Sequence, residues 1–304
     1  MRISVIIPTY NESSGIAETI GRAYAQTRKP DEVLVVDDST DSTPQIVSSL
    51  AKKYKRLRLI RGIRKGVSAA RNLGAREAKG DIIVFLDADV LLGKDCLEKA
   101  EAKFREKGVE LVHWFNPPQK PRTFMEKCNY VRIRHLSGRA AGEIIEAPHA
   151  YLRTTFQRLG GFNESLRYFE DREIYDRIRK AGLQVHKVDA IAEHAEPGSF
   201  GDFYKQASWL GRSLSPSLMR WRIRALFYPL GPVYWLAFLL SLLLSAFYQP
   251  ALYALAVLVF IMLVELARCI WLTGMVLPSL CYMPLSLLRQ FVVAFSLLRK
   301  IAAR

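Results

Sequence analysis

A run of apolar residues that ends at two carboxylates most constrains how this chain can fold. Residues 82–86 read Ile-Ile-Val-Phe-Leu and are followed by Asp87-Ala88-Asp89. Five consecutive apolar residues predict a strand buried on both faces, as in a parallel sheet covered by helices. Ligands of such sheets bind at the carboxyl ends of the strands. Alternation along an extended chain points Asp87 and Asp89 the same way, with the small Ala88 between them.

Two carboxylates at a strand end suit Mg²⁺ or Mn²⁺, which favour carboxylate and phosphate oxygens. Solvated or helix-capping aspartates would have the same local sequence, so the neighbouring segments must decide between the two interpretations.

The preceding segments alternate between strand and helix patterns. Residues 3–7, 33–36 and 58–60 read as strands, and residues 67–78 as a helix. This alternation predicts a parallel α/β sheet with right-handed crossovers. Neither common glycine-rich phosphate-binding motif is present in the sequence, so a bound diphosphate would need a metal ion to offset its charge.

The last third of the chain has a different composition. Residues 225–298 are almost unbroken apolar and divide into pieces at 225–247, 251–273 and 275–298, each long enough to span a bilayer. Two prolines, Pro278 and Pro284, and the charged Arg289 leave open the alternative that the last segment is broken or re-entrant.

The net charge of +15 includes eight basic residues and one acidic residue within positions 220–304. Basic residues that flank apolar helices favour anionic lipid over nucleic acid. Arg220, Arg222 and Arg224 place the start of the first span on the cytosolic side.

Four segments together resemble the family 2 glycosyltransferases of the GT-A type. They are residues 4–12 (Ser-Val-Ile-Ile-Pro-Thr-Tyr-Asn-Glu), 32–43, 70–74 (Ala-Arg-Asn-Leu-Gly) and the strand that ends Asp87-Ala88-Asp89. They occur in the family's order and spacing, and the resemblance covers residues 3–195.

The resemblance implies a donor site and a metal site. It assigns Mn²⁺ or Mg²⁺ to Asp87 and Asp89. In some relatives a histidine at the position of His194 completes this metal site, although a lone histidine is more often structural. It places Arg71 near the diphosphate. The remaining donor-binding residues that it implies are Pro8, Tyr10, Glu12, Asp38 and Ala88.

The family pattern continues with an acceptor-side segment. Here it reads Leu-Gly-Gly-Phe-Asn-Glu at 159–164, followed by Phe169-Glu170-Asp171 and a helix up to Gly182. The resemblance implies that Asp171, beside Glu170, is the general base of an inverting displacement. Carboxylates are also favoured at any helix N-terminus, which is the simpler alternative.

Two segments are candidates for the membrane surface. Residues 121–139 predict an amphipathic helix at the membrane or the acceptor cleft, or else an ordinary surface helix, and residues 200–221 predict an interfacial helix. Its end partly resembles the Gln-x-x-Arg-Trp motif of cellulose- and hyaluronan-synthase-like enzymes through Arg220 and Trp221. The glutamine is missing, so processive synthesis is not implied.

The expected architecture is an α/β GT-A domain, Rossmann-like with a mostly parallel sheet, plus an α-helical transmembrane domain. We expect a cytosolic catalytic domain at 1–199, interfacial helices at 200–224 and about three membrane helices at 225–304. The protein would be a multi-pass membrane protein with a cytoplasmic catalytic domain.

The opening loop and Asp37-Asp38 also resemble polyprenol-phosphate mannose synthases. We therefore expect transfer of mannose from GDP-mannose to an acceptor linked to dolichyl or polyprenyl phosphate. A UDP-sugar-dependent transferase that makes a surface polysaccharide or glycolipid is the alternative. A non-catalytic membrane scaffold is the alternative from another class.

Overall fold

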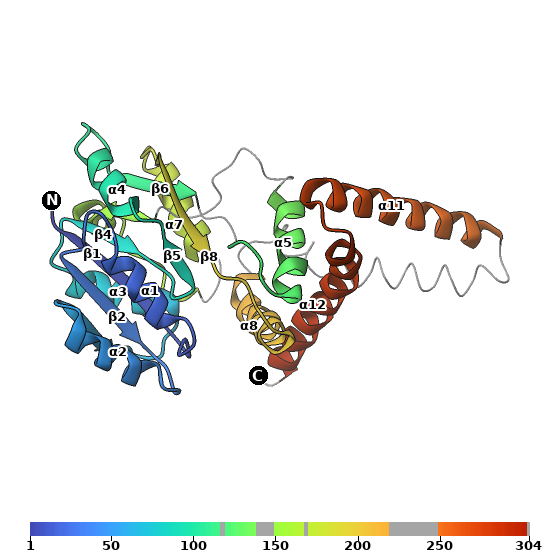
Figure 1. The fold of residues 1–304 in the computed structure, drawn as a ribbon, viewed down its shortest axis with the longest axis horizontal. Helices are drawn as coiled ribbons and strands as arrows, with labels where there is room; N and C mark the ends of the chain where they lie inside the picture. Colours follow the sequence, from blue (N-terminus) through green and yellow to red (C-terminus); the bar gives the residue numbers. More distant parts are fainter. Residues whose placement is uncertain (116–118, 138–148, 167–169, 219–248, 303–304) are drawn as a thin grey trace. The chain divides into compact units, whose positions relative to one another are not determined.

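The computed structural model describes residues 1–115, 119–137, 149–166, 170–218 and 249–302 (Figure 1). The chain divides into two compact units. Unit 1 comprises Met1–Gln119 and Ile144–Ala195, and unit 2 comprises Lys120–Glu143 and Glu196–Arg304. Residues 120–143 thus group with the C-terminal helices, although they lie between strands of unit 1 in the sequence.

Unit 1 is built on an eight-stranded sheet in the order β3-β2-β1-β4-β7-β6-β8-β5. Its elements in chain order are β1 (Ile3–Thr9), α1 (Ile16–Tyr24), β2 (Glu32–Asp37), α2 (Thr43–Lys53), β3 (Leu57–Arg61), α3 (Val67–Glu77), β4 (Ile82–Phe85), β5 (Val90–Leu92), α4 (Cys96–Phe104), β6 (Leu111–Phe115), β7 (Ala150–Leu152), α6 (Arg153–Arg158), α7 (Glu170–Lys180) and β8 (His186–His194). The strands and the helix expected before residue 90 agree with β1, β2, β3, α3 and β4 to within a few residues.

The sheet is mixed. The pairs β1–β2, β1–β4, β2–β3 and β6–β8 are parallel, whereas β4–β7, β6–β7 and β5–β8 are antiparallel. The prediction of a mostly parallel sheet therefore describes the first four strands, and the later strands add antiparallel pairs. Short strands such as β5 and β7, three residues each, carry too little periodicity to reveal their partners.

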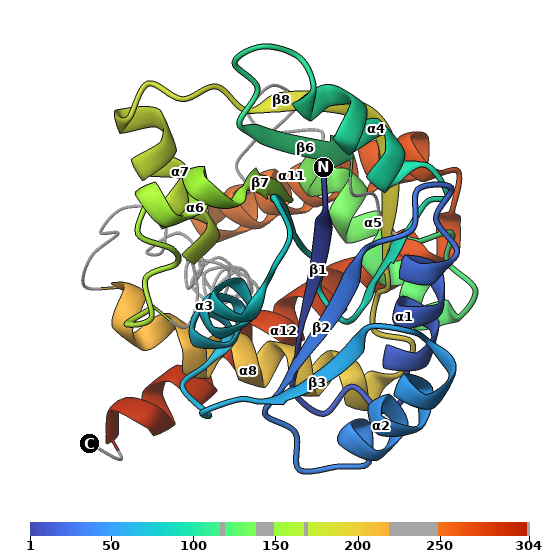
Figure 2. The same cartoon turned by 90° about the vertical axis from the view of Figure 1, so that its left-hand side faces the viewer.

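Helices cover both faces of this sheet (Figure 2). Alternate residues of β1, β2 and β4 enter two separate clusters: Val5, Val33 and Val84 lie with α1, α2 and α4, whereas Ile6, Leu34 and Ile83 lie with α3, α6 and α7. Each fully buried aliphatic side chain contributes about 1.5–3 kcal/mol relative to exposure. Burial on both faces explains why these strands read as continuous apolar runs.

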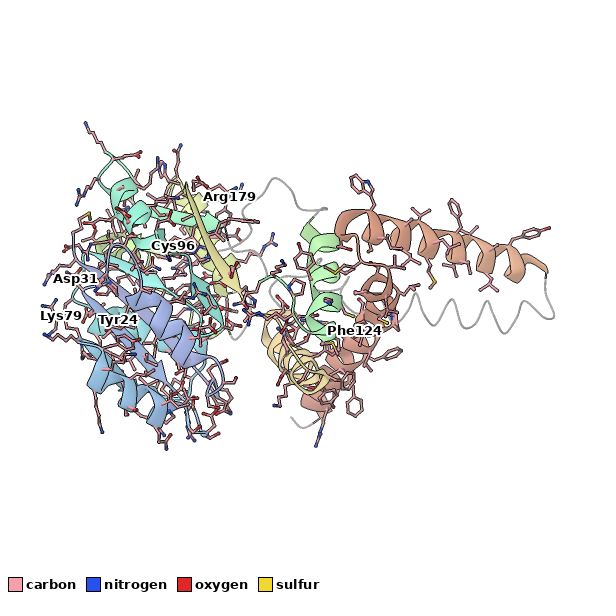
Figure 3. All side chains as sticks on the ribbon, in the orientation of Figure 1. Tyr24, Asp31, Lys79, Cys96, Phe124 and Arg179 are labelled. Atoms are coloured by element: carbon pink, nitrogen blue, oxygen red, sulfur yellow. The ribbon has the colours of Figure 1, made fainter. Side chains whose placement is uncertain are left out.

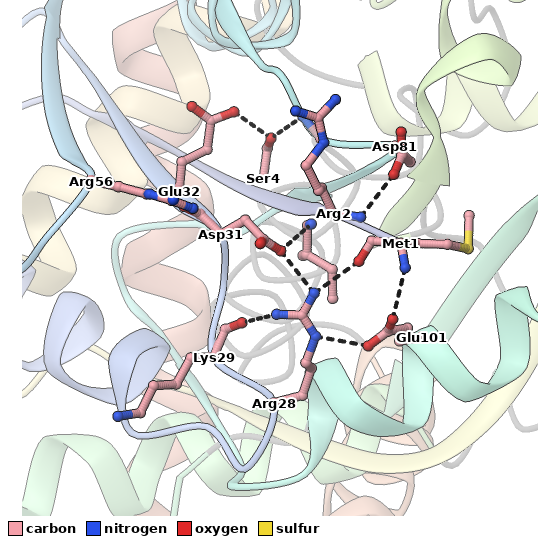
Figure 4. Close-up of polar contacts among 12 residues, drawn as sticks. Met1, Arg2, Ser4, Arg28, Lys29, Asp31, Glu32, Arg56, Asp81 and Glu101 are labelled. Carbon is pink, nitrogen blue, oxygen red and sulfur yellow. Dashed lines mark hydrogen bonds and ion pairs between the residues drawn. The ribbon is translucent and has the colours of Figure 1, made fainter.

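The amino ends of the strands are held by a polar cluster around Arg28 (Figure 4). Its guanidinium donates to Asp31 and Glu101, each at 2.8 Å. Asp31 also accepts the backbone N–H of Ile3 at 2.9 Å. Arg28 thereby ties the start of β1 to α4, at the edge opposite the carboxyl ends.

Unit 2 consists of helices among the described residues: α5 (Phe124–Ser137), α8 (Phe200–Leu218), α11 (Gln249–Thr273) and α12 (Val276–Ala302). Helix α12 packs against α8 and α5, and α11 packs against α5 and α12. Figure 3 shows the side chains of both units, with Phe124 labelled at the start of α5. The expected segments 251–273 and 275–298 coincide closely with α11 and α12.

Helix α12 is continuous across Pro284, so the last apolar segment is one helix and is not broken there. Its Arg289 is 8% exposed and donates to Gln206 of α8 at 2.8 Å. Within α12, Val276–Val293 is long and apolar enough to cross a membrane, and it is the candidate found in the described part of the chain. The expected span at 225–247 lies outside the described residues.

The close approach of α3 to the sheet depends on Gly74. A Cβ atom at this position would lie 2.4 Å from Cγ2 of Ile6 and 3.2 Å from Cγ2 of Val36. Both neighbours are fully buried, so neither can move aside without disturbing the core.

We therefore expect Gly74→Ala to lower the stability of unit 1 by about 1–3 kcal/mol through overpacking. The control is Gly21→Ala in α1, where the new Cβ would lie 3.8 Å from the nearest atom, the Tyr54 hydroxyl. That control should keep or raise the melting temperature, because alanine favours helix by up to about 1 kcal/mol. Thermal unfolding of both full-length variants measures the difference, and equal melting temperatures would contradict the packing argument.

Candidate active site

The candidate site lies at the carboxyl edge of β1, β2 and β4. Thr9 pairs with Asp37 in the parallel register of β1 and β2, and β4 lies on the other side of β1. The segments that follow these strands carry Glu12, Asp38, Asp87 and Asp89. Parallel pairing therefore brings carboxylates from three separate parts of the sequence to one edge.

Asp87 and Asp89 have different partners. Asp87 accepts a hydrogen bond from Arg71 of α3 at 2.6 Å. Asp89 lies beside His194, with 3.3 Å between Oδ2 and Nε2. The sequence predicted that both carboxylates point the same way, whereas the structure divides them between two neighbouring groups.

The contact between Asp89 and His194 is set by backbone pairing. Val90 pairs with His194 in the antiparallel register of β5 and β8, and the Asp89 carbonyl accepts the N–H of Ala195 at 2.8 Å. Both side chains are partly exposed, at 41% and 31%. The structure thus brings together two of the three predicted metal ligands, which are 105 positions apart in the sequence.

Asp89 and His194 lie close enough together to hold a metal ion jointly, and the metal-binding role of Asp87 stays a prediction. One carboxylate and one imidazole leave most coordination positions of a cation such as Mn²⁺ for phosphate oxygens and water. In the described part of the chain, no group of three or more His, Cys, Asp or Glu side chains is gathered for metal binding. The donor set fits a metal that is held jointly by protein and substrate.

Arg71 contacts three carboxylates of the site. Besides Asp87, its Nη1 donates to Glu170 at 3.0 Å and to Asp171 at 3.4 Å. The side chain is 7% exposed. Burial alone would lower the pKa of Arg71, but the three carboxylates hold it above its ordinary value.

The same contacts determine the charge of Asp87. Burial opposes ionisation of this carboxyl, but the adjacent charge of Arg71 and its hydrogen bond hold the pKa below the ordinary value. Asp87 is therefore ionised and already paired. The prediction that places Arg71 near a diphosphate stays a prediction, and the structure shows this guanidinium engaged by carboxylates.

Glu170 and Asp171 open α7 but differ in exposure. The Glu170 side chain is 10% exposed and faces Arg71, whereas the Asp171 side chain is 45% exposed. Asp171 is thus the member of the pair that a substrate can reach. Glu170 is placed to hold the helix start against α3.

The loop after β1 supplies Glu12. Its pKa is raised from 4.5 to about 7 by burial and then by the negative charges of Asp89, Asp41 and Asp87, while His194 acts in the opposite direction. The backbone N–H of Glu12 donates to Thr43 at 2.9 Å. Glu12 therefore lies within the same electrostatic cluster as the two aspartates after β4.

The other predicted donor residues have distinct environments. Tyr10 is 62% exposed, whereas Ala88 is 5% exposed and belongs to the core cluster beside α1. Asp38 accepts the N–H of Arg64 at 2.8 Å, which holds the loop after β3. Pro8 is buried within β1. The donor-binding roles of these residues stay predictions, and Arg220 and Trp221 lie outside the described residues.

Two further residues near the site, His149 just before β7 and Tyr151 on β7, were not predicted from the sequence. The His149 ring stacks on His113 and Trp114, with ring centroids 4.6 and 4.7 Å apart. Burial and His113 lower its pKa to about 3, so the ring is neutral beside Asp87. Burial and the charge of Asp171 raise the pKa of Tyr151 well above its ordinary value. No local motif marks either residue, because β7 reaches the site only by pairing with β4.

Comparisons with known proteins identify the family of the chain. A sequence profile of glycosyl transferase family 2 matches residues 4–160, just over half of the chain. The match covers β1 to β7 and thus the strands whose carboxyl ends form the candidate site. The chain belongs to glycosyltransferase family 2, which confirms the family prediction.

Among curated relatives, an uncharacterized glycosyltransferase of Rickettsia felis is 34% identical over 168 residues, covering 54% of this chain and 27% of the relative. A dolichol-phosphate mannosyltransferase of Pyrococcus furiosus is 40% identical over 92 residues, covering 30% of this chain and 26% of the relative. The alignments thus span about a quarter of the length of these relatives.

A mannosyltransferase from Pyrobaculum calidifontis, solved with GDP-Man and Mn²⁺, superposes with a TM-score of 0.58 at 23% identity and covers 98% of this chain and 87% of its own. Residues 1–349 of TarS from S. aureus, solved with UDP-GlcNAc, give a TM-score of 0.51 at 19% identity, with 98% and 92% covered. These similarities show the shared fold and are consistent with a GT-A domain.

The raised pKa of Glu12 makes a stability prediction. Because the folded pKa of about 7 exceeds the ordinary 4.5, the neutral Glu12 stabilises the fold at low pH, and this contribution is lost as the pH rises through 7. Glu12→Gln stays neutral, so its stability relative to the parent should grow between pH 4.5 and 7 and then level off at about 1–3 kcal/mol.

Melting temperatures between about pH 5 and pH 8.5, with EDTA and without nucleotide, measure this trend. The control is Glu18→Gln on α1, whose side chain is 62% exposed. A Glu12→Gln difference that does not change with pH would show that Glu12 does not titrate in this range.

Proposed function

We propose that the protein transfers a sugar from a nucleoside diphosphate sugar to a lipid-linked acceptor, with inversion at the anomeric carbon. The observation that carries this proposal is the convergence of Asp87, Asp89, His194 and Asp171 at the carboxyl edge of one sheet. Arg71 joins two of them directly. A donor-side metal and an acceptor-side base are the two elements that such a displacement needs.

The proposed reaction is a displacement at the anomeric carbon of the donor sugar. The acceptor oxygen forms a new bond to this carbon as the bond to the diphosphate breaks. Asp171 takes the proton of the acceptor hydroxyl, because it is the exposed carboxylate of the α7 pair. Asp89 and His194 would hold Mn²⁺ or Mg²⁺, which supplies charge neutralisation of the leaving diphosphate.

GDP-mannose is the donor that we favour, with an acceptor carried on dolichyl or polyprenyl phosphate. It is supported by the names of two similar proteins, a dolichol-phosphate mannosyltransferase and a mannosyltransferase solved with GDP-Man and Mn²⁺. A UDP-sugar is the second candidate, supported by the similarity to TarS solved with UDP-GlcNAc. A scaffold without activity would not need the charged side chains that the site retains.

The donor and the metal should bind as one unit. A ligand that binds only the folded state stabilises it by about 2.7 kcal/mol at a hundredfold excess over its dissociation constant. Nucleoside diphosphate should therefore raise the melting temperature far more with Mn²⁺ than with EDTA, and Asp89→Ala should remove this difference. Asp95→Ala is the control, because Asp95 pairs with Lys99 on the surface of α4. A metal-dependent shift that survives Asp89→Ala would place the metal elsewhere.

The acceptor chemistry is tested at Asp171. A sugar hydroxyl needs a base, whereas a phosphate acceptor is already ionised near pH 7. Asp171→Asn should lower turnover by about 10²–10⁴-fold and leave the donor-dependent thermal shift intact. Asp176→Asn on the same helix is the control. Near-normal turnover of Asp171→Asn would exclude an essential base at this position and favour a bare polyprenyl phosphate as acceptor.

We further propose that unit 2 is membrane-integral, with unit 1 on the cytosolic side. The support is the apolar stretch within α12 and the exposed apolar side chains of α11, including Tyr253, Phe260 and Trp271. The basic residues before position 225 favour this orientation. The full chain should stay in the membrane pellet after an alkaline carbonate wash and enter solution with detergent. Release by carbonate alone would contradict an integral unit 2.

A further inference from the structure

One guanidinium connects the two halves of the proposed site. Arg71 reaches Asp87 through Nη2 at 2.6 Å, and Glu170 and Asp171 through Nη1 at 3.0 and 3.4 Å. Asp87 belongs to the strand end where the donor would bind, and Asp171 belongs to the acceptor side. In the sequence, Asp87 is only 16 positions from Arg71, whereas Glu170 on α7 is 99 positions away.

The position of this guanidinium is itself fixed. It lies over the Phe162 ring, 5.2 Å from the centroid. The next residue, Asn72, donates to the Phe162 carbonyl at 2.8 Å and accepts its N–H at 2.9 Å. Helix α3 in turn packs closely on β1 through Gly74. The Arg71–Asn72 pair therefore holds the segment before α7 against a rigid part of the sheet.

The chemistry of arginine suits this bridging position. Its planar fork offers separate N–H groups in fixed directions, so one side chain can bind carboxylates on two sides at once. A lysine ammonium keeps the charge but is a single point on a flexible stem. Removal of the charge would leave the buried Glu170 without this partner, which destabilises a protein strongly.

We propose that Arg71 is a positioning residue that holds the Asp171 carboxylate at a fixed place relative to Asp87, so that the base meets the acceptor beside the bound donor. This proposal rests on the proposed function of Asp171. A misplacement of about 1 Å at a reacting group can cost about 100-fold in rate. Arg71 would therefore act on turnover through Asp171 and leave donor affinity unchanged.

A double-mutant cycle with Arg71→Lys and Asp171→Asn tests this role. Arg71→Lys keeps the charge but loses the bridge, so turnover should fall by about 100-fold while the donor-dependent thermal shift stays unchanged. The double variant should turn over no more slowly than Asp171→Asn alone, because Arg71 acts through that carboxylate. A purely structural role would make the two effects multiply.

The control is Arg28→Lys, which removes a comparable bridge between Asp31 and Glu101 at the opposite edge of the sheet. It should lower the melting temperature and leave turnover unchanged. If Arg71→Lys does not fold, Arg71→Gln combined with Glu170→Gln replaces it, because that pair leaves no unpaired charge between these two positions. The expected loss of turnover is the same.

The outcomes separate the proposals. Loss of the donor-dependent thermal shift in Arg71→Lys would make Arg71 a donor-binding residue and overturn its positioning role. If Asp171→Asn lowers turnover and adding Arg71→Lys lowers it further by the full factor of the single variant, the positioning role would also be overturned. The assignment of Asp171 as the base would then stand. Near-normal turnover of Asp171→Asn alone would refute the base assignment, and with it the action of Arg71 through that base.

Discussion

The site depends on a buried cation that is shared by three carboxylates. Arg71 is 7% exposed and contacts Asp87, Glu170 and Asp171. A buried guanidinium is tolerated only where hydrogen bonds and opposite charges replace water. The carboxylates, in turn, could not lie so close together without the cation between them. This mutual requirement joins α3, the end of β4 and the start of α7 into one arrangement.

The arrangement also separates the roles of carboxylates that look equivalent in the sequence. Asp87 is paired with Arg71, whereas Asp89 lies beside His194. The Glu170 side chain is 10% exposed, whereas that of Asp171 is 45% exposed. The two members of each doublet thus have different surroundings. Burial lowers the pKa of His149 to about 3 and raises that of Tyr151 well above its ordinary value.

Helix α3 shows how packing supports this arrangement of side chains. Gly74 brings the helix close to Ile6 of β1, and Arg71 and Asn72 lie on the same helix and face the segment around Phe162. The motif Ala-Arg-Asn-Leu-Gly thus combines a polar clamp with a close-packing position within one turn and a half. A clamp on a rigid helix holds its partners better than a clamp on a loop.

The sequence alone determined the β1, β2, β3, α3 and β4 elements, because buried parallel strands read as uninterrupted apolar runs and helices alternate with them. It also determined the family, since four motifs carry that information locally. The tertiary structure decided the antiparallel half of the sheet, the division of Asp87 and Asp89 between Arg71 and His194, and the inclusion of His149 and Tyr151. These features depend on which distant strands pair and on which charges share a buried space. Such relations arise from long-range contacts, and no local pattern of residues records them.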